Sequence, residues 1–146
     1  MVDRVVRRPG AASAEASVAN VLQRVRGLCL ALPETREVSA WGHPVFKAGA
    51  KAFAAIEPIK GRPSVAFRLA PVDIDLLLQR PSFFATPYGR GLWVSVWADS
   101  PLDWTLMARL VDSSYRMVAL KRMLKALEAG APPPRVRVTP KARTGR

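Results

Sequence analysis

The chain has 146 residues, enough for one domain with a hydrophobic core and too few for two domains of ordinary size. Its 23 Lys and Arg residues against 11 Asp and Glu residues give a formal net charge of +12, and 49% of the residues are hydrophobic. This composition excludes a chain that is disordered throughout and favours an anionic partner, while one cysteine and one histidine exclude an internal disulfide and a Cys/His zinc site.

The two ends of the chain differ in composition from its middle. Residues 1–13 are basic and lack the apolar run of a signal peptide, and residues 129–146 combine Pro, Gly and Arg without apolar periodicity. We expect both segments to be disordered basic tails around a single domain at 14–128. No apolar run approaches the roughly 20 residues that span a bilayer. We therefore expect a cytoplasmic protein with no membrane partner.

The first predicted element is an amphipathic helix over residues 17–32. Its apolar residues recur every three or four positions, and Pro33 ends the pattern. Cys29 falls on the apolar stripe, with no neighbouring base to activate its thiol. That position is typical of a small buried side chain and not of a nucleophile.

Three strands are predicted next, at residues 45–47, 51–57 and 64–69. Ala48-Gly49-Ala50 forms a three-residue hairpin connection between the first two, and a Gly/Pro turn at 59–63 joins the second to the third. In the third strand, apolar residues alternate with small or charged ones, as in a half-buried strand. The pattern predicts a three-stranded antiparallel meander.

The remaining predicted elements are a short helix at 71–79, a strand at 92–97 and a long helix at 101–127, with Ser100 as its N-cap. A short strand near Phe84 or Tyr88 is expected to pair with residues 92–97. The resulting order is α-β-β-β-α-β-β-α, in which strands and helices are segregated. We therefore predict an α+β fold of two layers, with helices on one face of an antiparallel sheet.

Four segments in this order closely resemble the signature segments of the MmcQ/YjbR family: Leu32-Pro33-Glu34-Thr35, Trp41 to Lys47, Gly49 to Phe53, and Ser114 to Ala119. The resemblance covers about residues 17–124. It implies a compact α+β domain related in shape to frataxin (CyaY-like) and secretion-chaperone folds, and DNA binding through a "double-wing" motif. The chain departs from the usual family pattern at Ala50, where Gly is more common, and at Leu120, where Pro often stands.

Few residues in the sequence support catalysis or metal binding. An enzyme needs a reactive group with a positioned partner, and His43 stands between Gly42 and Pro44 with no carboxylate or thiol known to approach it. We expect His43 to bond to a backbone carbonyl or to stack on Trp41. Iron binding of the frataxin kind would need a ridge of carboxylates that the first helix and strands lack. We expect no catalytic residue, metal or cofactor, and an enzyme that uses His43 stays an alternative.

Positive charge is concentrated in residues 42–70, where five basic residues face Glu57 alone. Consecutive hairpin connections lie at opposite ends of a meander, so its tip cations form two groups. Such cations can hold phosphates, although exposed tips also collect Lys and Arg simply because they are solvated. Six residues are the candidate nucleic-acid contacts: Lys47, Lys51, Lys60, Arg62, Arg68 and Arg90.

These observations predict a non-enzymatic module that binds DNA or another nucleic acid through basic hairpin tips. The alternative is a protein-interaction or chaperone-like module, or a homodimer, that uses a sheet face carrying Trp93 and Trp97. The same two tryptophans could stack bases, or could pack under a helix or loop. The sequence leaves these alternatives open.

Overall fold

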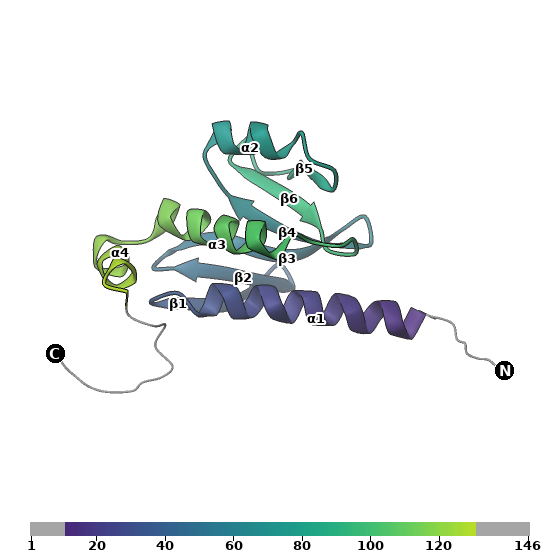
Figure 1. Cartoon of the computed structure of the whole chain (residues 1–146), viewed down its shortest axis with the longest axis horizontal. Helices are drawn as coiled ribbons and strands as arrows, with labels where there is room; N and C mark the ends of the chain where they lie inside the picture. The colour runs from purple at the N-terminus through teal and green to yellow at the C-terminus, as the bar shows by residue number, and fades with distance from the viewer. Residues whose placement is uncertain (1–10, 131–146) are drawn as a thin grey trace.

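The structure is a computed structural model that describes residues 11–130, with side chains described from Ser17 onward (Figure 1). The tails expected at 1–13 and 129–146 lie almost wholly outside the described residues. The elements are α1 (Ala11–Leu30), β1 (Thr35–Ala40), β2 (His43–Ala48), β3 (Lys51–Ile59), β4 (Arg62–Arg68), α2 (Pro71–Leu77), β5 (Phe83–Ala85), β6 (Trp93–Trp97), α3 (Trp104–Val118) and α4 (Lys121–Glu128).

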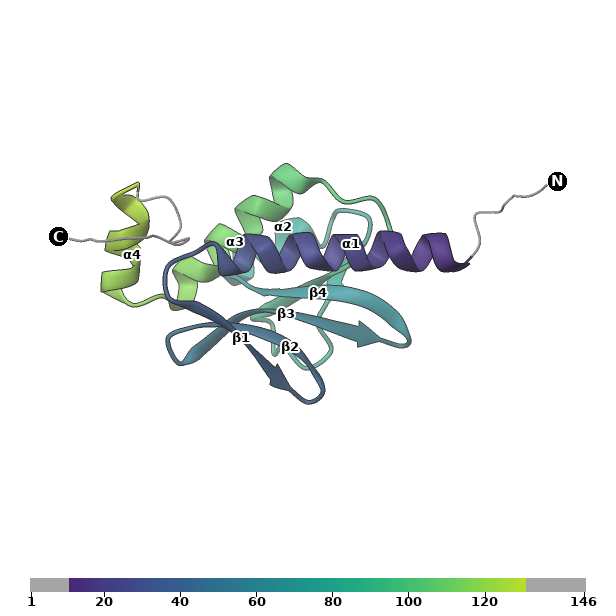
Figure 2. The same cartoon turned by 90° about the horizontal axis from the view of Figure 1, so that it is seen from below.

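The strands form one six-stranded sheet in the order β1-β2-β3-β4-β6-β5, and all neighbouring strands are antiparallel. Helices α1 and α3 lie on the same face of this sheet, and Figure 2 shows the opposite face without a helix. The predicted α+β fold, with helices on one face of an antiparallel sheet, is confirmed. We call the side without helices the open face.

The hydrophobic core lies between the sheet and the helices. Alternate strand residues such as Phe46, Phe67 and Val94 are fully buried there, and Val25 and Cys29 of α1 are buried against them. The side chain of Asp103 caps α3 by accepting a hydrogen bond from the Leu106 amide at 3.1 Å. One face of this helix is buried in the core and carries Met107, Leu110, Val111 and Val118.

Strand β1 was not predicted from the sequence. It is an edge strand, and its six residues alternate between half-buried and exposed with one irregularity, because charged side chains occupy two of the six positions. Short charged edge strands give a weak hydrophobic signal, although they protect a sheet from pairing with another chain. The meander therefore has four strands, β1 to β4, and not three.

The predicted helix at 101–127 is divided into α3 and α4, and it begins at Trp104, with Asp103 and not Ser100 as its N-cap. Ala119 and Leu120 are extended, with ψ angles of 146° and 159°, so the chain turns before α4 begins. After the turn, Met123 is buried, and both it and Leu120 lie close to Gly49 in the turn between β2 and β3. Burial of Met123 accounts for a break that the helical periodicity alone does not show.

Strand β3 contains one extra residue relative to β2. Ala48 pairs with Lys51, so the connection is Gly49-Ala50, one residue shorter than predicted. The register then shifts between Phe46 and Lys47, because Lys47 pairs with Ala52 and Phe46 with Ala54. The bulge leaves both Phe53 and Ala54 in the core.

Tyr115 connects α3 to the segment that precedes β1. Its ring is fully buried and meets the Phe53 ring edge-on at 5.8 Å between centroids, and its hydroxyl donates to the Pro33 carbonyl at 2.8 Å. We predict that Tyr115→Phe lowers the free energy of unfolding by about 1 kcal/mol, because it leaves this carbonyl without its partner. Urea unfolding followed by circular dichroism measures the change. Ser113→Ala, at an exposed position of the same helix, is the control, and equal stability of Y115F and the wild type would contradict the prediction.

Candidate functional site

A cavity of about 470 Å³ opens on the open face of the sheet. Ala40, Val45, Ala52 and Ala55 line it from three neighbouring strands, and they belong to a small apolar cluster separate from the main core. The cavity exists because these side chains are short where a larger residue would fill the space. Its volume lies within the range of roughly 300–1,000 Å³ found for ligand pockets.

Three aromatic side chains line the same cavity: Trp41, Tyr88 and Trp93. Trp41 lies in the two-residue turn between β1 and β2, where it and Gly42 have φ angles of 56° and 82°. Two successive positive φ angles define the type I′ hairpin turn, which favours Asn or Gly at the position that Trp41 takes. A left-handed conformation costs a non-glycine residue about 1–2 kcal/mol. Trp41 is also 86% exposed, so packing within the fold does not offset this strain.

Tyr88 lies on the loop between β5 and β6, which folds back onto Trp93. The Gly89 amide donates to the Thr86 carbonyl at 3.1 Å, and the Leu92 amide donates to the Gly89 carbonyl at 2.8 Å. A Cβ atom at Gly89 would lie 2.7 Å from the Trp93 Cβ, closer than two such atoms can approach. Glycine at this position therefore allows the loop to hold Tyr88 beside Trp93.

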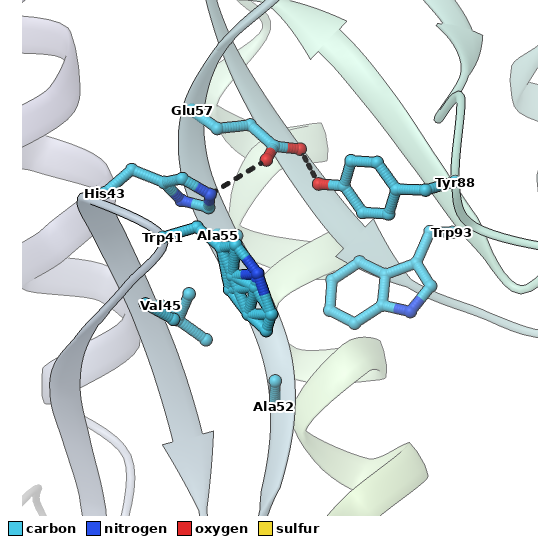
Figure 3. Close-up of a pocket in the computed structure, with 9 residues that line it drawn as sticks. Trp41, His43, Val45, Ala52, Ala55, Glu57, Tyr88 and Trp93 are labelled. Carbon is cyan, nitrogen blue, oxygen red and sulfur yellow. Dashed lines mark hydrogen bonds and ion pairs between the residues drawn. The ribbon is translucent and has the colours of Figure 1, made fainter.

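One end of the cavity is polar, and Glu57 occupies its centre (Figure 3). The Glu57 side chain is 5% exposed, and its Oε2 lies 3.2 Å from His43 Nε2, while its Oε1 accepts a hydrogen bond from the Tyr88 hydroxyl. Burial raises the pKa of the Glu57 carboxyl above its ordinary value, and the neighbouring His43 opposes that rise. His43 Nδ1 is buried and has no partner within the described residues.

The expectation for His43 was therefore wrong, because its partner is a carboxylate. His43 is the first residue of β2, and Val45 pairs with Ala55. Continuing this register backwards places His43 opposite Glu57. The bulge in β3 is needed for the pairing, since the tighter register at Ala48 and Lys51 would offset the two residues by one position. The available signal was a histidine just before one predicted strand and an acid at the end of the next, with a single hairpin turn joining the two strands.

Two of the six predicted cations lie on the open face beside the cavity. Lys47 pairs across the strands with Ala52, and Arg68 pairs with Trp93, so each is directly opposite a residue that lines the cavity. Arg36 of β1 pairs with Lys47 and extends the row, with its guanidinium donating to the Gly49 carbonyl at 2.6 Å. Sequence reasoning placed Arg68 on the face opposite Val65 and Phe67, and this is confirmed.

The other predicted cations are exposed and do not join this group. Lys51 begins β3 and Lys60 lies in the turn between β3 and β4, at opposite ends of β3 as expected for a meander. Arg90 lies in the loop between β5 and β6. Arg62 makes two hydrogen bonds of 2.9 Å to Asp99 and lies 3.9 Å above the Trp97 ring, so its charge is already compensated.

The two tryptophans of β6 have different surroundings. Trp93 lines the cavity, whereas Trp97 stacks on Phe84 with 4.1 Å between ring centroids and is covered by Arg62 on its ring. Trp97 therefore packs against side chains of the two strands next to β6, one from β5 and one from β4. Trp93 is the one of the pair that a ligand in the cavity could contact.

The described residues do not offer a reactive cysteine or a cluster of metal-binding side chains. Burial raises the pKa of the Cys29 thiol to about 12, so the thiol is not a nucleophile at neutral pH. Among the side chains that the structure describes, those of residues 17–130, no three His, Cys, Asp or Glu groups gather as a metal site requires. Over residues 11–130, no helix is both long enough and apolar enough to cross a membrane.

The raised pKa of Glu57 predicts how stability depends on pH. Because the folded state binds this proton more tightly than the unfolded state, the resulting stabilisation is fully present below the unfolded pKa and is lost as pH rises through the folded pKa. The free energy of unfolding of the wild type should therefore fall relative to that of E57Q as pH rises from the ordinary range of a glutamate pKa through the raised pKa of Glu57. Urea unfolding at several pH values measures the difference.

A second background provides the control for this prediction. His43 lowers the pKa of Glu57, so replacing His43 by Asn in both the wild type and E57Q should extend the fall in the stability difference between the two proteins to higher pH. A difference that stays constant with pH would show that the buried carboxyl does not titrate differently in the folded state.

Comparison with known proteins identifies relatives of this fold. Residues 30–117 match the model of the YjbR family. A Deinococcus radiodurans protein with a DUF419 domain has a similar structure, with a TM-score of 0.59 and 22% identity over 76% of this chain and 88% of that one. A Pseudomonas syringae structural-genomics target gives a TM-score of 0.53 and 16% identity, over 59% and 88% of the two chains.

The two solved structures are too distant in sequence to show more than the shared fold. A search of the curated proteins finds no match to this chain. The family match nevertheless covers more than half of the chain, from the end of α1 to the end of α3. The chain therefore belongs to the YjbR family.

Proposed function

We propose that this protein is a non-enzymatic nucleic-acid-binding module that binds a single-stranded segment across the open face of its sheet. The observation that carries the proposal is the position of Lys47 and Arg68 directly opposite two residues of an aromatic-lined cavity. Bases stack on aromatic side chains, with about 1–3 kcal/mol per base, and Lys and Arg hold phosphates. The open face therefore offers aromatic side chains for the base and cationic side chains for the phosphate.

A single strand fits this surface better than a duplex. The cavity is one site with a floor of small side chains, and bases inside a duplex are stacked and paired, so their faces do not reach such a site. Sheet faces that carry aromatic side chains recognise unpaired bases in other nucleic-acid-binding modules. The DNA-binding role implied by the family resemblance is then carried by the sheet face.

The hairpin tips have a secondary role in this proposal. Lys51 lies at the same end of the sheet as Lys47, but it pairs with Ala48 of the core and so lies on the helix side of the sheet and not on the open face. Lys60 lies at the far end, and Arg62 is occupied by Asp99. The tips alone offer two separated cations, which is less than a continuous phosphate track needs.

The proposal predicts a change in the salt dependence of binding. The full chain should bind a labelled single-stranded oligonucleotide, and replacing both Lys47 and Arg68 by Gln should reduce the slope of log K against log salt by about 1.4. Each cation that contacts a phosphate contributes about 0.7 to this slope for a single strand. Fluorescence anisotropy at several salt concentrations measures it.

One matched control and one variant of residues 129–146 separate the open face from general positive charge. Arg109→Gln with Lys121→Gln removes the same charge from exposed positions on α3 and α4, and should leave the slope nearly unchanged. A third variant replaces the basic residues of 129–146 by Gln, which removes five positive charges outside the described residues. If binding depends on those five charges and not on Lys47 and Arg68, the proposal for the sheet face fails.

A second candidate function is protein interaction, and the exposure of Trp41 favours it. A tryptophan that is 86% exposed on a hairpin tip is typical of a residue that anchors a partner or a second copy of the chain. Sedimentation and tryptophan emission on dilution test this alternative. A dimer that dissociates with a red shift, and that Trp41→Asn abolishes, would favour interaction over nucleic-acid binding.

A further inference from the structure

We propose that the cavity is a pocket for one unpaired guanine base, and that Glu57 recognises the edge of that base. The inference deepens the proposed function, on which it rests for the phosphate contacts. The pocket itself should also accept a free guanine nucleotide. Three observations carry it: the hydrogen-bonding capacity left on Glu57, the shape of the cavity, and the distance from Glu57 to the cations.

The Glu57 carboxylate keeps acceptor capacity after its contacts within the protein. An ionised carboxylate has about four lone-pair sites on its two oxygens. His43 Nε2 takes one site on Oε2, and the Tyr88 hydroxyl takes one on Oε1. Each carboxylate oxygen can therefore accept one further hydrogen bond. A ligand that satisfies both needs two parallel N–H donors, and such charge-assisted pairs are stronger than neutral ones.

Guanine is the nucleobase with this arrangement of donors. Its N1–H and 2-amino groups are adjacent and point in the same direction, so they match the two oxygens of one carboxylate. Adenine and cytosine present one amino group next to a ring nitrogen that accepts. Uracil and thymine present a single N–H between two carbonyls. A carboxylate facing any of these would meet an acceptor as well as a donor.

The shape of the cavity suits a flat ring. In Figure 3, Glu57 lies between His43 and Tyr88, with Trp93 on the side of Tyr88 and the small side chains of Ala52 and Ala55 below. Short floor residues leave a shallow space, and the aromatic walls offer faces for stacking. A planar base can contact both the floor and the rings.

The spacing between the polar end and the cations suits a nucleotide. His43 and Lys47 lie on the same face of β2 four residues apart, which is roughly 13 Å along a strand. A nucleoside phosphate is somewhat shorter from its base edge to its phosphate, and the long side chains of Lys47 and Arg68 can cover the difference. A buried carboxylate among aromatic rings could also attract an organic cation. The positive charges of Lys47 and Arg68 beside the cavity disfavour that ligand.

The strained turn at Trp41 agrees with a ligand-binding role. Its positive φ and its exposure are unfavourable for the isolated fold, and strained residues of this kind gather at ligand sites. A base in the cavity would cover part of the Trp41 ring. Trp41→Asn relieves the strain because Asn tolerates the left-handed region, so this variant should be at least as stable as the wild type and should bind the base less tightly.

Isothermal titration of the full chain with GMP, IMP and AMP tests the inference. IMP differs from GMP only in lacking the 2-amino group, so GMP should bind about tenfold more tightly or better, and AMP should bind more weakly than IMP. E57Q should reduce the affinity for GMP to near that for IMP. Glu37→Gln, which removes an exposed carboxylate paired with Arg26 on the helix side, is the matched control.

The outcomes separate this inference from the proposed function. Equal binding of the three nucleotides, or a preference for GMP that E57Q and W41N leave intact, would overturn the guanine pocket. Binding of single strands that depends on Lys47 and Arg68 without any preference for G would retain the proposed function and reject the inference. Selective binding of GMP by a protein that does not bind single strands would retain the pocket and reject the strand-binding function.

Discussion

The extra residue in β3 determines which side chains face the helices and which face the cavity. Because Phe53 and Ala54 both point into the core, the alternation along the strand changes phase after Ala52. Ala52, Ala55 and Glu57 then share the open face, while Phe53 and Ile56 pack under the helices. A regular strand would turn Glu57 into the hydrophobic core, where a carboxylate without partners is strongly unfavourable. One bulge therefore supports both the core and the polar end of the cavity.

Most of the fold was predictable because its signals are local. The apolar stripe of α3, the alternation in β4 and the glycine turns each depend on a few neighbouring residues. Strand β1 was missed because its charged edge positions weaken the alternation. The break between α3 and α4 was missed because the side chains of Leu120 and Met123 pack beside Gly49, which lies more than 70 residues earlier in the chain. Local pattern predicts elements well, and distant contacts decide where some of them end.

The candidate site was less predictable, since its parts come from separate segments. His43 and Glu57 are in contact because a bulge in β3 shifts the register, and no sequence pattern predicts this bulge. Tyr88 contacts Glu57 from the loop that follows β5. Net charge gave partial guidance: Lys47 and Arg68 do lie beside the cavity, whereas Arg62, which carries the same charge, is held by Asp99. Counting cations identifies a basic segment. A cation of that segment is available to bind an anion only if no carboxylate of the protein is already paired with it.

The hydrogen bond between Tyr88 and Glu57 joins two parts of the sheet that are not adjacent. The loop that carries Tyr88 follows β5 at one edge, while Glu57 belongs to β3, and β4 and β6 lie between them. The open-face residues of β4 beneath this crossing, Ser64 and Ala66, are small. Any ligand that rests against both Tyr88 and Glu57 would oppose local opening of the β5 and β6 edge. A ligand in the cavity would then slow amide hydrogen exchange in β5, an edge strand that the ligand does not contact.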